Sequence, residues 1–237
     1  MNALHPPVCA AIALDLDGTL VDSAADIRHA LNTALVNAGL RPFDLETVRA
    51  WIGDGPDALI RRALAQQGIA TADDALRVHL RRAFDVATLA APLAAGSVYP
   101  GIAELIAALH GRLPMVVVTN KPTPLARAVL DAAQLLPFVA AVHGADSSAL
   151  RKPAPAMLLA AAERLVVAPA DMLMVGDSAA DMQAAFAAGC PSLLAGWGYG
   201  CEELPAWLTP RRIATPAALL DLLEGGLQRR EANTLQL

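Results

Sequence analysis

The sequence predicts an α/β protein: a doubly wound, Rossmann-like parallel sheet with a helical domain inserted after its first strand. From residue 101 onward, short apolar runs alternate with segments of helical periodicity, which is the pattern of a parallel sheet covered by helices. Residues 23–95 contain helical patterns and no persuasive strand. Several of the apolar runs end in polar residues, at the sheet edge where α/β proteins bind their ligands.

The first predicted strand, Val8–Leu14, reads VCAAIAL and is apolar throughout, as expected for a central strand covered on both faces. It runs directly into DLDGTLVDS, where Asp15 and Asp17 precede a turn that Gly18 makes possible. An isolated Asp-x-Asp is more often a turn or a helix cap. At the tip of a buried strand, however, two carboxylates indicate a functional site.

The next segment, residues 23–95, predicts an inserted helical cap over a core built from residues 1–22 and 96–237. Its expected helices are Ile27–Ala38, Leu45–Trp51, Asp57–Gln67 and Asp73–Ala87. The chain crosses between cap and core near Asp22 and Ser23, and again near Gly96. We hypothesise that the cap moves as a body about these two crossings.

The rest of the core alternates between helices and strands, which with the first strand makes a sheet of about five or six strands. The expected helices are Ile102–His110, Pro124–Leu135, Ala156–Leu165 and Ala179–Ala188, and the expected strands are Met115–Val118, Phe138–Val142, Met172–Val175 and Ser192–Ala195. From Gly225 onward little apolar periodicity remains, so the C-terminus is predicted to be a loose tail.

Composition excludes several classes of protein. The net charge is -5, which gives no reason to expect nucleic acid binding. No apolar run approaches the roughly 18–20 residues of a membrane helix, and the N-terminus lacks the basic segment of a signal peptide. Three scattered cysteines suggest neither a disulfide framework nor a zinc site. We therefore expect a cytoplasmic protein without nucleic acid or membrane partners, either a monomer or a homodimer.

Polar residues follow three of the predicted strands and should meet at one edge of the sheet. They are Asp15 and Asp17 after the first strand, Thr119 and Asn120 after Val118, and Asp177 and Ser178 after Val175 and Gly176. Lys152, in the loop before another helix, can point to the same edge. One cation, the hydroxyl group of Thr119 and three acids are thus expected to converge.

This combination suits phosphate chemistry with a hard cation. Carboxylates without His or Cys favour Mg²⁺, which also removes the repulsion between Asp15 and Asp177. Asp15 is then the natural nucleophile toward phosphorus, and Asp17 is placed to protonate the leaving oxygen and to activate water. Lys152 and Thr119 are expected to bind the phosphoryl group. A small phosphorylated metabolite is the expected substrate.

Four ordered motifs resemble those of haloacid dehalogenase superfamily phosphatases. They are DLDGT at Asp15–Thr19, VVTN at Val117–Asn120, KPAP at Lys152–Pro155 and GDSAAD at Gly176–Asp181. Further stretches resemble the phosphoglycolate phosphatase branch: WIGDGPDAL at Trp51–Leu59, TNKPTP at Thr119–Pro124, AAGCPS at Ala187–Ser192 and WGYG at Trp197–Gly200. The resemblance spans nearly the whole chain and implies 2-phosphoglycolate as the substrate.

The resemblance also implies a role for each motif residue. Asp15, the backbone carbonyl of Asp17 and Asp177 would bind Mg²⁺, while Asp181 and Ser178 would support the site from behind. Substrate binding would involve Gly18, Thr19 and Asn120. Gly53 is a further candidate, in a loop that either faces the substrate from the cap or only connects two helices. Asp17 argues for phosphate chemistry, since the dehalogenases of this superfamily need no second acid two residues after the nucleophile.

Some alternatives stay open at the level of sequence. The substrate is 2-phosphoglycolate, another small phosphoester or a sugar phosphate, and a phosphomutase is possible on the same core. A phosphonate hydrolase is disfavoured because residues 23–95 contain no lysine for a Schiff base. A signalling module that only accepts phosphate would need neither Asp17 nor an inserted cap.

Two sets of polar residues have more than one interpretation. An arginine of the cap can grip a substrate carboxylate bidentately, although most of these arginines are expected on solvated helix faces. The cap arginines considered are Arg28, Arg49, Arg61, Arg62, Arg81 and Arg82. Asn120 and Lys121 either reach the leaving group or cap the following helix.

Overall fold

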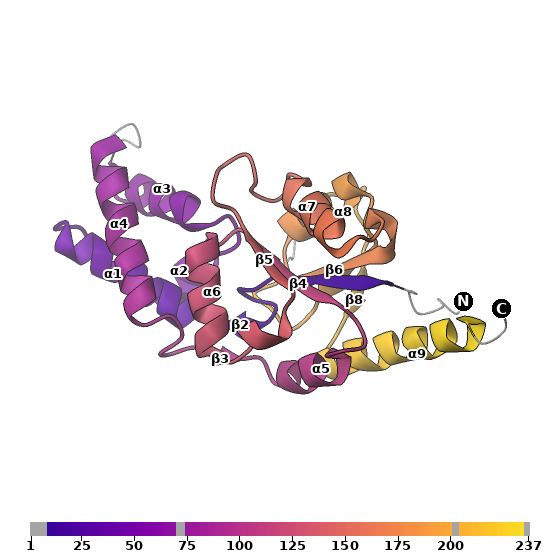
Figure 1. Cartoon of the computed structure of the whole chain (residues 1–237). Coiled ribbons are helices and arrows are strands. Elements are labelled where there is room, and N and C mark those ends of the chain that lie inside the picture. Colours follow the sequence, from indigo (N-terminus) through magenta and orange to yellow (C-terminus); the bar gives the residue numbers. More distant parts are fainter. Residues whose placement is uncertain (1–8, 70–73, 201–203, 235–237) are drawn as a thin grey trace.

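The computed structural model describes residues 9–69, 74–200 and 204–234. In this part of the chain one parallel sheet has the strand order β5-β4-β1-β6-β7-β8 (Figure 1). The strands are β1 (Ala11–Leu14), β4 (Met115–Thr119), β5 (Ala141–Gly144), β6 (Met172–Gly176), β7 (Ser192–Ala195) and β8 (Arg211–Ile213). The predicted α/β fold with a parallel, Rossmann-like sheet is confirmed.

Helices cover both faces of the sheet, and β1 shows how. Ile12 and Leu14 face one hydrophobic cluster, whereas Ala11 and Ala13 face another, because successive side chains of a strand point to opposite faces. The first face is covered by α5 (Ile102–Leu109), α6 (Thr123–Ala132) and α9 (Pro216–Thr234), and the second by α7 (Ala156–Leu165) and α8 (Ala179–Ala188). Burying one such Ile or Leu contributes roughly 1.5–3 kcal/mol.

Four further helices lie to one side of the sheet in Figure 1, and we call them the cap helices. They are α1 (Ala24–Asn37), α2 (Leu45–Arg49), α3 (Pro56–Gln66) and α4 (Asp74–Ala90). Their apolar faces share a separate cluster that includes Leu31, Leu64 and Phe84, and Leu125 of α6 joins it from the core. The expected start of the last helix, Asp73, lies outside the described residues.

The two crossings to the cap helices lie side by side, which sequence reasoning did not anticipate. The two-residue strands β2 (Val21–Asp22) and β3 (Ser97–Val98) pair antiparallel. Next to them, the backbone N–H of Ala95 donates to Asp26 Oδ1 at 2.8 Å. A Cβ atom on Gly96 would lie 2.3 Å from the carbonyl oxygen of Asp22, so this close approach requires glycine. Movement about the crossings stays a prediction.

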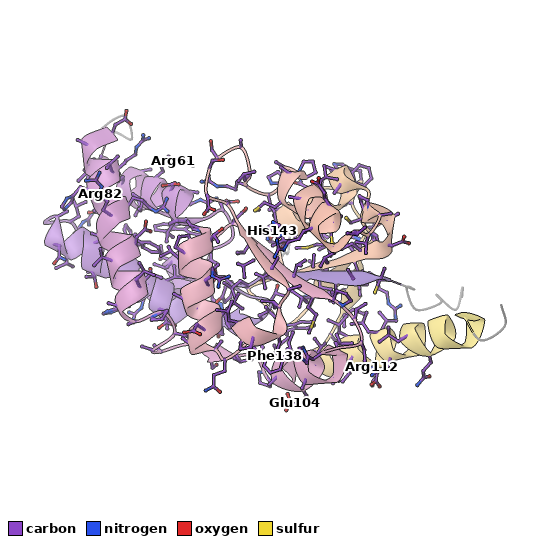
Figure 2. The ribbon with its side chains drawn as sticks, viewed as in Figure 1. Arg61, Arg82, Glu104, Arg112, Phe138 and His143 are labelled. Carbon is purple, nitrogen blue, oxygen red and sulfur yellow. The ribbon has the colours of Figure 1, made fainter. Side chains whose placement is uncertain are left out.

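Two strand boundaries differ from expectation. The predicted strand Phe138–Val142 is wrong at its start, because Leu136–Phe138 forms the 3₁₀ turn η1 and β5 begins only at Ala141. Phe138, labelled in Figure 2, packs edge-on against His110 with ring centroids 5.2 Å apart. The first strand begins at Ala11, and its expected start, Val8, lies outside the described residues.

The predicted loose tail is wrong for residues 225–234, which continue helix α9 as far as Thr234. Leu219, Leu223 and Leu227 recur every four residues and are buried in the sheet's main cluster. The pair Gly225–Gly226 lowers helix propensity and so hides this stripe in the sequence. None of the helices in the described ranges combines the length and the apolar character needed to span a membrane.

Candidate active site

The carboxyl ends of β1, β4 and β6 bring Asp15, Thr119 and Asp177 to one edge of the sheet. In the parallel register, Leu14 pairs with Val117 of β4 and with Val175 of β6. The backbone N–H of Asp15 extends this pairing, since it donates to the carbonyl oxygen of Val175 at 2.9 Å. The three polar side chains are buried, so any ligand here is held largely away from water.

The carboxylates at this edge are close enough to share a cation. One oxygen from each of Asp15, Asp177 and Asp181 lies within 4.8 Å of the others. Burial, together with Asp181, raises the pKa of Asp15 to about 6 even though Lys152 opposes the shift. Burial and the charges of Asp15 and Asp181 raise the pKa of Asp177 to about 8. The cluster therefore carries more negative charge than Lys152 balances.

Two observations show that a divalent metal fits this cluster. No hydrogen bond of normal geometry from the described residues reaches the buried Oδ1 of Asp15, although Lys152 Nζ forms an ion pair with it at 2.8 Å. Asp177 also keeps coordination capacity, since a carboxylate offers about four lone-pair sites and this one accepts only two hydrogen bonds in the described part of the chain. A hard cation with oxygen ligands suits both carboxylates.

Lys152 is buried with 2% exposure and reaches the tips of two strands. Its Nζ lies 2.8 Å from Asp15 Oδ1, donates to Asp181 Oδ1 at 2.5 Å and donates to the carbonyl oxygen of Val118 at 2.8 Å. Burial alone would lower the pKa of Lys152, but Asp15 and Asp181 outweigh it and raise the pKa above its ordinary value. The ammonium group is therefore a fixed positive charge beside Asp15.

Asp181 is positioned by the first turn of α8. Ser178 and Asp181 form a capping box, in which the backbone N–H and the hydroxyl group of Ser178 donate to Asp181 Oδ2 at 3.0 and 2.6 Å. Since Oδ1 already accepts from Lys152, both oxygens of Asp181 are engaged. Asp181 is thus better suited to orient Lys152 than to bind a metal.

Asp177 is held by contacts from both sides of the site. Thr19 Oγ1 donates to its Oδ1 at 3.3 Å, and the backbone N–H of Tyr199 donates to its Oδ2 at 2.9 Å. Gly18 has φ +89°, and a Cβ atom there would lie 2.2 Å from Asp177 Oδ2. The absence of a side chain at Gly18 therefore creates the space that the Asp177 carboxylate occupies.

We expect Gly18→Ala to lower turnover by roughly 100-fold, because the new methyl group displaces Asp177 in addition to straining the turn. Gly39→Ala is the matched control, since Gly39 also has a positive φ (+72°) but a Cβ atom there meets nothing within 4 Å. It should cost about 1 kcal/mol of stability and leave turnover unchanged. Phosphate release and urea unfolding of both variants test this; equal turnover in the two would contradict the packing argument.

Asp17 stands apart from the metal cluster and has two close partners that sequence reasoning missed. Ser23 Oγ donates to its Oδ1 at 2.5 Å. Lys121 Nζ lies 2.8 Å from each of its carboxylate oxygens. Ser23 closes the DLDGTLVDS motif, which is the signal in the sequence, whereas for Lys121 the sequence allows either contact with the leaving group or capping of the following helix.

Asn120 connects the core to the loop between α2 and α3. Its Nδ2 donates to the carbonyl oxygen of Gly53 at 2.8 Å and to that of Lys152 at 3.1 Å, while its Oδ1 accepts from the N–H of Lys152 at 2.7 Å. A Cβ atom on Gly55 would lie 2.7 Å from the carbonyl oxygen of Asn120. The Gly53–Gly55 loop therefore packs directly on the strand tip.

A cleft separates the strand tips from the cap helices. Its core side is polar and consists of Asp15, Asp17, Thr119, Asn120 and Lys121. Its cap side is mainly apolar and consists of Ile27, Trp51, Ile52, Gly53, Gly55, Pro56, Leu59 and Phe84. Thr119 Oγ1 accepts from the N–H of Lys121 at 3.2 Å, which fixes the start of the loop. The cleft suits a small ligand with one charged end.

The order of these strand-tip residues is that of a known hydrolase family. The model of the haloacid dehalogenase-like hydrolases matches residues 9–189. The chain belongs to this family. Hydrolases of this family use a divalent metal, and the Asp15–Asp177 pair is where the described residues fit one.

Similar proteins narrow the reaction class of this hydrolase. The phosphoglycolate phosphatase of Escherichia coli (strain K12) is 40% identical over 210 residues, which cover 81% of this chain and 83% of the relative. That of Rhodospirillum rubrum is 42% identical over 198 residues, covering 82% of each chain. The crystal structure of a predicted phosphoglycolate phosphatase from Haemophilus somnus 129pt aligns with a TM-score of 0.81 at 29% identity, over 90% of this chain and 97% of that one. This family member is thus a phosphoester hydrolase.

A ligand-bound neighbour agrees with that activity. CbbY from Rhodobacter sphaeroides, solved in complex with phosphate, aligns with a TM-score of 0.77 at 26% identity, over 91% of this chain and 99% of that one. The resemblance to haloacid dehalogenase superfamily phosphatases, inferred from the four motifs, and that to phosphoglycolate phosphatases, inferred from the further stretches, are both confirmed.

Proposed function

We propose that this hydrolase is a Mg²⁺-dependent phosphatase that converts 2-phosphoglycolate to glycolate and phosphate through an aspartyl phosphate on Asp15. The observation that carries the proposal is the pairing of Asp15 with the buried Lys152 ammonium group at 2.8 Å, beside Asp177 and Thr119. A carboxylate at the end of a strand, next to a fixed cation, is arranged to attack a phosphoryl group. The substrate follows from the phosphoglycolate phosphatases that are 40% identical.

In the first step an oxygen of Asp15 attacks phosphorus as the bond between phosphorus and the leaving oxygen breaks. Lys152 neutralises negative charge on the phosphoryl oxygens, and Asp181 holds Lys152 in place by the 2.5 Å contact. Thr119, Asn120 and the turn at Gly18 and Thr19 bind and orient the phosphoryl group.

Asp17 serves as the acid and then as the base. It gives a proton to the leaving oxygen of glycolate and later accepts one from the water that hydrolyses the aspartyl phosphate. Its carboxyl group is oriented by Ser23, which donates to it at 2.5 Å. The second step releases phosphate and restores Asp15.

The metal in this proposal is Mg²⁺, bound by the carboxylates of Asp15 and Asp177 and by the backbone carbonyl of Asp17. Hard oxygen ligands and the lack of His or Cys in the described cluster support this choice. When bound, Mg²⁺ supplies positive charge that keeps the carboxylates ionised and polarises the phosphoryl oxygens. Ser178 and Asp181 stabilise the site from behind through the capping box of α8.

We further propose that residues 23–95 form a cap domain that closes the cleft over the substrate, with residues 1–22 and 96–237 as the catalytic core. Two contacts support a closed arrangement: Asn120 with the carbonyl oxygen of Gly53 at 2.8 Å, and Arg151 with Asp57 at 3.3 Å. The enzyme is expected in the cytoplasm as a monomer or homodimer, which cell fractionation and light scattering will test.

The test is phosphate release from a panel of small phosphomonoesters, measured with Mg²⁺ and after chelation. The panel contains 2-phosphoglycolate, 2-hydroxyethyl phosphate and sugar phosphates. We expect turnover only with metal, and the highest kcat/KM for 2-phosphoglycolate. A preference for another ester would retain the chemistry and reject the substrate. Interconversion of sugar phosphates without phosphate release would favour a mutase.

A further inference from the structure

We propose that Lys121 is the group that recognises the carboxylate of the substrate. This inference rests on the proposed function, because it assigns the specificity of the same site to one residue. The substrate class that it predicts is a phosphate ester with a carboxylate two atoms beyond the phosphorus-bound oxygen.

Lys121 is the cation on the leaving-group side of the cleft. Its ammonium group lies 2.8 Å from both carboxylate oxygens of Asp17, the proposed proton donor to the leaving oxygen. Its side chain is 6% exposed, so the charge is held in place and shielded from bulk water. Lys152, the other lysine of the chain, sits at Asp15, on the side where phosphorus is attacked. The two lysines therefore mark the two ends of a small substrate.

The cap side of the cleft offers no competing positive charge among the described lining residues. Its side chains are apolar, from Ile27, Trp51, Ile52, Pro56, Leu59 and Phe84. Of the described residues that line the cleft, Lys121 alone carries a positive charge. A substrate carboxylate placed against those apolar groups would be buried without a partner, which is costly.

None of the cap arginines considered for this role lines the cleft. Arg49 stacks over the Tyr199 ring at 5.0 Å, and Arg62 pairs with Asp54. Arg81 pairs with Asp57 and Asp85. Arg61 and Arg82, labelled on α3 and α4 in Figure 2, both line another depression, which is distinct from the cleft.

The geometry points to an exchange of carboxylates. Without substrate, Lys121 is paired with Asp17. In 2-phosphoglycolate the carboxylate is separated from the leaving oxygen by a single carbon, so a substrate whose leaving oxygen lies at Asp17 places its carboxylate within reach of the same ammonium group. The ammonium group of Lys121 then exchanges the carboxylate of Asp17 for that of the substrate, so its charge stays paired. Asp17 is released to protonate the leaving oxygen. An ester without the carboxylate cannot displace Lys121 from Asp17.

The experiment compares kcat/KM for 2-phosphoglycolate with kcat/KM for 2-hydroxyethyl phosphate, whose hydroxymethyl group replaces the carboxylate. We expect wild type to prefer 2-phosphoglycolate and Lys121→Gln to lower this preference by roughly 10- to 100-fold, the range of a charge-assisted hydrogen bond. Lys121→Arg keeps the positive charge and should retain most of the preference. A role of Lys121 only in orienting Asp17 would slow both esters equally and leave the ratio unchanged.

If wild type prefers 2-phosphoglycolate and Lys121→Gln has the same ratio of kcat/KM values as wild type, the assignment of Lys121 is overturned while the proposed function stands. A wild type that does not discriminate between the two esters would overturn both. Lys121→Gln leaves Asp17 unpaired, and this variant can unfold. In that case the double variant Asp17→Asn/Lys121→Gln is compared with Asp17→Asn. Calorimetry measures how tightly each variant binds 3-phosphonopropionate and propylphosphonate. Loss of the preference for 3-phosphonopropionate supports the assignment, and its retention refutes it.

Discussion

Asp15→Asn is expected to reduce turnover by about 10⁴-fold or more, because an amide cannot replace the carboxylate that attacks phosphorus. The variant should remain folded. Burial raises the pKa of Asp15 to about 6. In the metal-free protein, ionisation of Asp15 therefore lowers the free energy of unfolding as the pH rises from about 4 through 6. An asparagine does not ionise, so the variant avoids this loss of stability. Phosphate release measures the loss of turnover, and circular dichroism measures the retained fold. Acid-stable labelling by ³²P-substrate detects the aspartyl phosphate, which this variant should not form.

Asp74→Asn provides the matched control. Asp74 lies at the start of α4, where its side chain is 81% exposed and paired with Arg77 on the surface. Removing such an exposed pair costs little, so this variant should keep wild-type turnover and labelling. Turnover above about one hundredth of wild type in Asp15→Asn, or labelling that persists, would remove Asp15 from the nucleophilic role.

Lys152→Met is expected to lower turnover by roughly 1000-fold and to destabilise the protein by about 3–5 kcal/mol. The ammonium group contacts Asp15 at 2.8 Å and Asp181 at 2.5 Å, and its removal leaves both buried carboxylates without their cation. Urea unfolding without metal gives the free energy of unfolding, and phosphate release with Mg²⁺ gives turnover.

The double variant Lys152→Met/Asp181→Asn separates the two effects. Neutralising Asp181 removes one unpaired charge, so part of the lost stability should return, whereas turnover should not, because the phosphoryl group still lacks its cation. If Lys152→Met alone is as stable as wild type, the ion pairs of Lys152 with Asp15 and Asp181 do not stabilise the fold. Recovered turnover in the double variant would contradict a direct role for Lys152.

The sequence predicts the fold and the strand-tip carboxylates well because both depend on short stretches of chain. Met172–Val175 is apolar and is followed at once by Gly176 and Asp177, so strand and site residue are read together. β8 was not located, because its three residues, RRI, include two exposed arginines and carry no apolar run. The stripe on α9 was missed because the two glycines interrupt the helical pattern.

Contacts made by long side chains and distant loops could not be predicted in the same way. Lys121 is adjacent to a recognised motif, but its pairing with Asp17 joins residues 104 positions apart and depends on where a flexible side chain ends. The N–H of Tyr199 reaches Asp177 from the loop after β7, and its hydroxyl group accepts from the N–H of Ser23. The WGYG motif marked this loop without indicating its partners.

The bond from Asn120 to the cap ends on the carbonyl oxygen of Gly53, not on a side chain. Every amino acid supplies a carbonyl, so this contact places no demand on which side chains the neighbouring cap residues carry. Gly53 itself, with φ +123°, favours glycine, whereas the side chains of Trp51 and Ile52 beside it line the cleft. Substitution of these side chains can thus reshape the cleft while the bond between Asn120 and the backbone of Gly53 is kept.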